Sequence, residues 1–146
     1  MASELFSESQ KTQVTDAIAR AERRSSGEIR VHIERKCQED VLDHAAFIFK
    51  ELKMHETADR NGVLIYMSFD DHKLAIIGDK NIHAHLGDTF WQDVKNFLIA
   101  EFKKESYVMG LTTAIDRIGI ELERYFPIQP SDTNELSNKI SFGDNI

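Results

Sequence analysis

Three short segments of the chain place acidic or amide side chains beside a glycine: Gly27-Glu28, Asp59-Arg60-Asn61-Gly62 and Gly78-Asp79. Carboxylate, amide and backbone carbonyl oxygens are the ligands that calcium takes, and glycine lets the backbone turn sharply or approach a ligand. The acceptor spacing and terminal glutamate of an EF-hand loop are missing. The pattern therefore predicts a cation site assembled by the fold, with calcium favoured and magnesium the other candidate, from Glu28, Asp59, Asn61 and Asp79. The alternative interpretation of residues 59–62 is a plain Asn-Gly turn with acidic capping residues.

Other reactive residue types form weaker patterns. Asp70-Asp71 lies between two short apolar runs, which is typical of a solvated hairpin turn rather than a metal pair. His83 and His85 are two positions apart, a spacing that shares a strand face but not a helix face, so zinc is not predicted there. The sequence assigns no histidine partner to Cys37, which is therefore interpreted as an inert thiol. The sequence contains no glycine-rich phosphate loop, nucleophile elbow or dinucleotide fingerprint.

Length and charge limit the class of protein. The chain has 146 residues and a net charge of −7, which suits one acidic domain. An acidic domain lacks the basic face that nucleic acid requires, and its charge favours cations as ligands. A lone cysteine excludes an internal disulfide and cysteine-rich metal sites. The start carries no basic and apolar leader, and no apolar run approaches the ~20 residues of a membrane helix, so we expect a soluble, cytoplasmic protein without membrane insertion.

Apolar periodicity predicts the elements that must position these residues. A capping box, Ser7-x-x-Gln10, opens the first helix, and Gly27 is its expected C-cap. An alternating strand follows, whose polar face suggests a sheet edge or partial cover. The remaining predicted elements are a helix over 40–54, a buried strand over 63–67, a strand over 73–77, a short helical turn over 81–86, a helix that Asp88 or Thr89 caps, and a helix over 107–125. Residues 128–146 are expected to form a loosely ordered polar tail in which Ile140 and Phe142 could dock.

The order of these elements predicts the topology. A helix between the first two strands favours a right-handed, parallel βαβ unit, and the short connection before the third strand favours an antiparallel hairpin. The expected fold class is α/β, a three-layer α/β/α sandwich with a small mixed sheet and helices on both faces. This topology brings Glu28, Asn61 and Asp79 to one end of adjacent strands. The opposite end carries Cys37, Glu39, Asp70, Asp71 and His72.

Several of the same segments resemble the TPM domain family. The resemblance rests on residues 27–31 (GEIRV), the block over 57–66 (TADRNGVLIY), residues 77–79 (IGD), and Gly110 before a helix that closes at Phe126-Pro127. It covers residues 6–127 and is strongest for short bacterial members that consist of a lone domain. The closing residues 140–144 also resemble tails of that group. The family includes a thylakoid-lumen acid phosphatase and membrane-anchored members, and this chain differs from the latter by having no anchor.

The resemblance implies an α/β/α sandwich and divalent-cation binding, with calcium favoured. The first functional hypothesis is accordingly a cation-binding domain that acts as a binding or interaction module towards a protein partner whose identity the sequence does not give. The alternative is a metal-dependent acid phosphatase acting on phosphomonoesters, with Asp79 as nucleophile or general acid and Arg60 on the phosphate oxygens. A third is a structural interaction domain without a ligand. The sequence shows no activated nucleophile for the second.

Overall fold

The computed structural model describes residues 2–129 and 140–143. The helices are α1 (Glu8–Glu22), α2 (Val41–Glu51), α3 (Lys80–Lys103) and α4 (Tyr107–Tyr125), and the strands are β1 (Glu28–Glu34), β2 (Gly62–Ser68), β3 (Lys73–Gly78) and β4 (Ser141–Gly143). Two short 3-10 helices cover Ala2–Glu4 and Met54–Glu56. The predicted order of elements from the first helix to the fourth is confirmed, and β4 is added to it.

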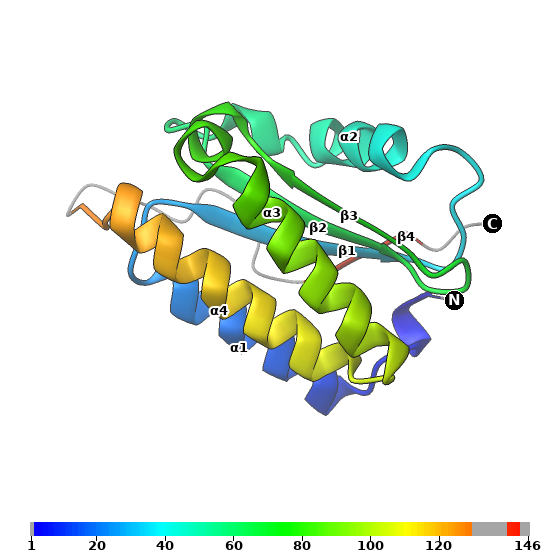
Figure 1. Cartoon of the computed structure of the whole chain (residues 1–146). Coiled ribbons are helices and arrows are strands. Elements are labelled where there is room, and N and C mark those ends of the chain that lie inside the picture. Colours follow the sequence, from blue (N-terminus) through cyan, green and yellow to red (C-terminus); the bar gives the residue numbers. More distant parts are fainter. Residues whose placement is uncertain (1, 130–139, 144–146) are drawn as a thin grey trace.

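The sheet is mixed and has the strand order β3-β2-β1-β4. β1 and β2 are parallel, with Glu28 opposite Gly62, and β2 and β3 are antiparallel, with Val63 opposite Gly78. Figure 1 shows α1, α3 and α4 on one face of the sheet and α2 on the other. The predicted α/β fold, with a small mixed sheet between helical layers, is confirmed.

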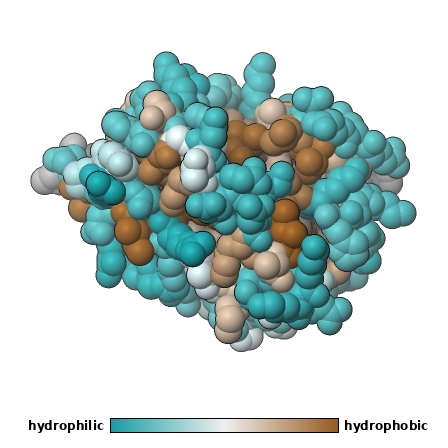
Figure 2. Space-filling view, viewed as in Figure 1, coloured by the Kyte–Doolittle hydropathy of each residue, from teal (hydrophilic) through white to brown (hydrophobic). Residues whose placement is uncertain are grey.

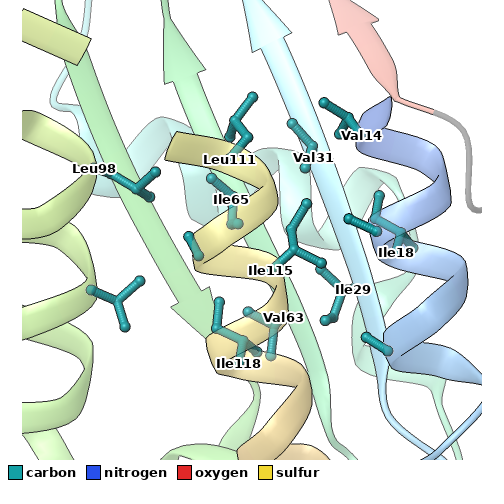
Figure 3. Close-up of a cluster of buried hydrophobic side chains, with 14 of the residues drawn as sticks. Val14, Ile18, Ile29, Val31, Val63, Ile65, Leu98, Leu111, Ile115 and Ile118 are labelled. Atoms are coloured by element: carbon teal, nitrogen blue, oxygen red, sulfur yellow. The ribbon is translucent and has the colours of Figure 1, made fainter. Parts of the chain in front are cut away.

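The largest core lies between the sheet and the layer of three helices. Figure 3 shows Ile29 and Val31 of β1 lying close to Ile18 of α1 and Ile115 of α4. All seven residues of β2 are buried, which confirms the predicted central strand and follows from helices covering both of its faces. A smaller core on the other face packs α2 against β2 and β3. The sheet is thereby held from both sides.

The first strand is more deeply placed than its alternating pattern predicted. β1 pairs with β2 on one side and with β4 on the other, so it is not an edge strand. Its polar side chains Glu28, His32 and Glu34 are buried. A strand from the far end of the chain covers the edge that the sequence alone leaves open.

Helix ends are partly as predicted. The capping box of Ser7 and Gln10 opens α1 as expected, each side chain bonding the other's backbone N–H. The expectation that Gly27 caps the end of this helix is wrong, because α1 ends at Glu22 with Arg23 as its C-cap. Gly27 is needed for packing instead: a Cβ there would lie 2.6 Å from a Leu122 methyl carbon.

The predicted short helical turn and the following helix form one ribbon with a kink. α3 is interrupted by non-helical backbone at Gly87, where φ is 74°. Glycine adopts this left-handed conformation without steric cost. The break therefore falls between the two predicted segments, and Asp79 rather than a later residue caps the start of the ribbon.

The predicted domain, 6–127, contains every helix and strand described here except β4 and the first 3-10 helix. Within the tail expected over 128–146, docking at Ile140 and Phe142 is observed: Ile140 is buried, and Ser141–Gly143 pairs with β1. The physical reason is the open edge of β1, whose backbone groups need partners. Residues 130–139 and 144–146 lie outside the described residues.

Within the described residues, no helix is both long enough and apolar enough to cross a membrane.

The central position of β2 gives a direct test of the fold. Replacing Ile65 by Ala, in a fully buried position, should lower the free energy of unfolding by about 2–5 kcal/mol, because it leaves a cavity in the core. Urea denaturation measures the change. Replacing Ile120, which is 62% exposed, by Ala should change it by less than about 0.5 kcal/mol. Equal effects at the two positions would contradict the core assignment.

Candidate functional site

The predicted site residues lie at one end of the sheet, around the starts of β1 and β2 and the end of β3. Glu28 begins β1 opposite Gly62, Asn61 immediately precedes β2, and Asp79 follows β3. The backbone N–H of Asp79 donates to the carbonyl of Gly62 at 2.8 Å. We call this end of the sheet, which carries Glu28, Asp59, Asn61 and Asp79, the acidic rim.

Asp59 and Asn61 are joined through one hydroxyl. The Ser26 Oγ–H donates to Asp59 Oδ2 at 2.8 Å and accepts from the Asn61 side-chain amide at 3.1 Å. Asn61 is completely buried, and its Oδ1 has no hydrogen-bond partner among the described residues. A buried amide oxygen without a donor is costly and calls for an explanation.

Asp79 is engaged with Arg60. The guanidinium donates from Nε to Oδ2 at 2.8 Å and from Nη2 to Oδ1 at 3.0 Å, a bidentate pair. The carboxylate raises the pKa of Arg60. Asp79 also accepts from the Lys80 backbone N–H as the N-cap of α3. The pair neutralises the two residues that the phosphatase hypothesis assigns to nucleophile and phosphate binding.

Glu22 is a rim residue that the sequence analysis missed. It ends α1, and its Oε2 accepts from the backbone N–H of Ile29 at 2.9 Å. Burial of the Glu22 carboxyl, together with repulsion from Glu28, raises its pKa to about 9. Glu22 therefore keeps its proton at neutral pH and shares it with Glu28 through a hydrogen bond. The signal that could have found it is its place at the last turn of a helix leading into a strand that starts with another glutamate.

The structure thus places the four predicted residues at one rim. There they form three groups, each with a bonding partner of its own. Asp59 and Asn61 share Ser26, Asp79 holds Arg60, and Glu28 interacts with Glu22. Among the described residues, no three histidine, cysteine, aspartate or glutamate side chains are grouped so that they could hold a metal ion. A cation bound here would draw on the Asn61 amide oxygen as well as carboxylates, and would have to compete with Arg60.

The opposite end of the sheet is held by its own ion pairs. Arg35 donates to Asp70 from Nε at 3.0 Å and from Nη2 at 3.2 Å. Asp71 accepts from the Cys37 backbone N–H and from the Ser68 hydroxyl, and these bonds lower its pKa. Asp71 thus fastens the β2–β3 hairpin to the segment after β1. Cys37 itself is buried, and its thiol donates to the Glu39 carbonyl.

His83 and His85 lie in different surroundings. His83 stacks on Trp91 and lies 3.1 Å from the Asp88 carboxylate. His85 stacks on Tyr125. The two rings pack against different elements.

A second buried polar cluster, also absent from the sequence analysis, sits under α2. Glu34 Oε1 accepts from the Tyr66 hydroxyl at 2.7 Å and contacts His44 Nε2 at 2.6 Å. Burial, followed by the bond to Glu34, raises the pKa of Tyr66. Burial opposes the charged form of His44, but its bonds to Glu39 and Glu34 outweigh it and raise its pKa. Through these two contacts, Glu34 links β1 to both α2 and β2.

Comparison with known proteins gives the family. A family model described as the TPM domain matches residues 2–120, most of the chain. The chain belongs to the TPM domain family. The segments that carried the resemblance include the acidic rim itself, since Gly27-Glu28, residues 57–66 and residues 77–79 all border it. No curated protein matches the chain.

Solved structures show the same TPM fold. The NMR structure of BA42 protein from the psychrophilic bacterium Bizionia argentinensis is 40% identical, with a TM-score of 0.89, over 95% of this chain and 96% of that one. An N-terminal domain from P. gingivalis is 18% identical with a TM-score of 0.69, over 84% and 79%. The N-terminal domain of cg2496 protein from Corynebacterium glutamicum is 12% identical with a TM-score of 0.65, over 82% and 75%. The last two are similar in fold alone.

The shared proton of Glu22 gives a pH prediction. Its pKa is raised from 4.5 to about 9, so between these values the folded state holds a proton that the unfolded state has released. The free energy of unfolding should then fall as pH rises through this window, with a slope from this group of at most about 1.4 kcal/mol per pH unit. Replacing Glu22 by Gln keeps an acceptor for Ile29 and removes the titration, so the profile should flatten.

Urea denaturation at several pH values measures this profile. The control is Glu123→Gln, which makes the same chemical change on the exposed side of α4 and should keep the wild-type slope. A Glu22→Gln variant with the wild-type slope would show that Glu22 titrates normally.

Proposed function

We propose that the TPM domain binds a divalent cation, with calcium favoured over magnesium, at the acidic rim. The observation that carries the proposal is the Asn61 Oδ1, which is completely buried and lacks a hydrogen-bond partner among the described residues. A cation would stabilise such a buried oxygen, because amide oxygens coordinate calcium. The same rim holds the carboxylates of Glu28, Asp59 and Asp79.

The charge of the rim supports a cation over an anion. Glu22, Glu28, Asp59 and Asp79 contribute four carboxyl groups, and Arg60 lies against one of them. Burial, together with repulsion from Glu28, raises the pKa of Glu22 to about 9, so its carboxyl is protonated at neutral pH. A bound divalent ion would replace that proton and supply the positive charge that the site otherwise takes from Arg60.

Arg60 acts in this proposal as a competitor for the ion. Its side chain is 37% exposed while that of Asp79 is 7% exposed, so the guanidinium can leave into water while the carboxylate stays in place. An ion that takes Asp79 changes the charge presented at the rim and frees Arg60. That change is how cation binding would control contact with a protein partner, which makes the domain a binding or interaction module.

Calcium titration of variants at Arg60 and Asp79 tests the site. Arg60→Asn removes the competitor and suits the left-handed backbone at this position, where φ is 49°. It should tighten calcium binding about three- to tenfold, since a competing cation is lost. Asp79→Asn should weaken binding about tenfold, since one charged ligand is lost. Isothermal titration calorimetry gives the constants.

Arg35→Asn is the matched control, because Arg35 forms the same bidentate pair with Asp70 at the opposite end of the sheet. It should leave calcium affinity within about twofold. Titrations in two buffers of different ionisation enthalpy should also detect proton release from Glu22 on binding. No binding at millimolar calcium, or equal effects of the two arginine variants, would overturn the proposal.

Metal-dependent hydrolysis of phosphomonoesters is the alternative, and one observation favours it. Glu22 holds a proton at neutral pH beside the predicted metal residues, as a general acid must. Against it, Asp79 and Arg60 are bound to each other. If the rim is catalytic, phosphate release from nitrophenyl phosphate with added calcium or magnesium should fall at least about hundredfold in Glu22→Gln, the usual cost of losing a general acid, and remain in Glu123→Gln. Absence of phosphate release would leave cation binding without catalysis.

A further inference from the structure

A cavity of about 360 Å³ lies at the opposite end of the sheet from the acidic rim. It is bordered by the β2–β3 hairpin, the last turns of α3 and the start of α4, which meet at one end of the molecule in Figure 1. We call it the hairpin pocket. Its volume is in the range of small-ligand sites, about 300–1,000 Å³. Figure 2 shows hydrophobic surface gathered over β3, between α2 and α3.

Three aromatic side chains form part of the wall of the hairpin pocket. Phe69, Phe102 and Tyr107 line it, with ring centroids 4.9 Å apart for Phe69 and Tyr107 and 5.4 Å for Phe102 and Tyr107. All three are half-buried, so each keeps a ring surface available to a ligand. Met67, Leu74 and Ile99 complete the apolar lining. At these centroid distances the rings contact one another and form one aromatic surface, against which a flat, ring-shaped occupant can pack.

The mouth of the hairpin pocket carries an excess of positive charge. Lys73 and Lys103 line it, with Glu105 as the acidic residue of the lining. Lys73 Nζ donates to the Cys37 carbonyl at 2.9 Å, and its charge helps to lower the pKa of Asp71. Lys103 is exposed and forms no ion pair within the part of the chain that the structure describes. An anionic group on the ligand would give Lys103 a partner.

Both loops at the mouth are held in costly backbone conformations. His72 has a φ of 54° and Glu105 a φ of 61°, and both line the hairpin pocket. Non-glycine residues are uncommon at positive φ, and such residues gather at ligand clamps and switch regions. The mouth is therefore shaped by two loops that each carry a small strain.

We propose that the hairpin pocket binds a small aromatic carboxylate. The ring of the ligand lies against the surface formed by Phe69, Phe102 and Tyr107, and its carboxylate faces Lys103 at the mouth. The aromatic walls select a flat apolar body, and the excess of lysine selects the negative charge. This site is separate from the acidic rim and does not depend on cation binding there.

Amide NMR titration with naphthoate tests the proposal. The expected result is saturable shifts confined to residues 67–74 and 99–107. Lys103→Gln should weaken binding about three- to tenfold, the size expected for one partly exposed ion pair. The matched control is Lys104→Gln, because Lys104 is the next lysine, is exposed, and lies outside the lining. It should change the dissociation constant by less than about twofold.

Two further measurements keep the result unambiguous. Naphthylmethanol, which has the same ring without the charge, should bind about three- to tenfold more weakly than naphthoate, as expected for the loss of one ion pair. Ile99→Phe, which fills part of the hairpin pocket, should abolish the shifts while the amide spectrum elsewhere stays that of the folded protein. Equal effects of Lys103→Gln and Lys104→Gln, equal binding of the neutral probe, or no binding at millimolar naphthoate would each overturn the proposal.

Discussion

The structure depends on one strand whose two faces are both buried but only one of which is apolar. β1 turns Ile29, Val31 and Ile33 towards the three-helix layer, and it turns its polar residues towards the other face. A buried polar group is costly unless it is paired. Much of the remaining architecture can be understood as the set of partners that this polar face requires.

Those partners come from distant parts of the chain. Glu34 takes the Tyr66 hydroxyl from β2 and the imidazole of His44 from α2, while His32 Nδ1 lies 2.8 Å from the Ser141 hydroxyl of β4. Gly143 is required beside them, because a Cβ there would lie 2.3 Å from a Glu34 oxygen. Placing β4 against β1 therefore satisfies a side chain and a strand edge together.

The same strand separates two regions of different character. Its start belongs to the acidic rim, where Glu28 meets Glu22 and where the buried Asn61 amide oxygen has no hydrogen-bond partner from residues 2–129 or 140–143. Its other end leads to the hairpin, where ion pairs of Arg35 with Asp70 and bonds to Asp71 fix the turn that borders the apolar pocket. Both ends use short loops on a rigid sheet, which is where ligand sites are usually found. Carboxylates lie at both ends, but at the hairpin end Asp70 is paired with Arg35 and Asp71 is bonded to Cys37 and Ser68, whereas the apolar pocket beside them is lined by aromatic rings and two lysines.

Local and periodic features were determined by the sequence alone. The capping box of Ser7 and Gln10, the apolar run of β2 and the parallel βαβ order all depend on residues close in sequence, and they fixed the α/β class and the rim that Glu28, Asn61 and Asp79 share. Only the tertiary structure decided which charges meet. The pairing of Arg60 with Asp79, the proton on Glu22 and the docking of β4 on β1 depend on side-chain placement and burial across elements. Periodicity specifies which face a residue occupies, but pKa and pairing follow from distances and desolvation, which arise only when those faces are packed together.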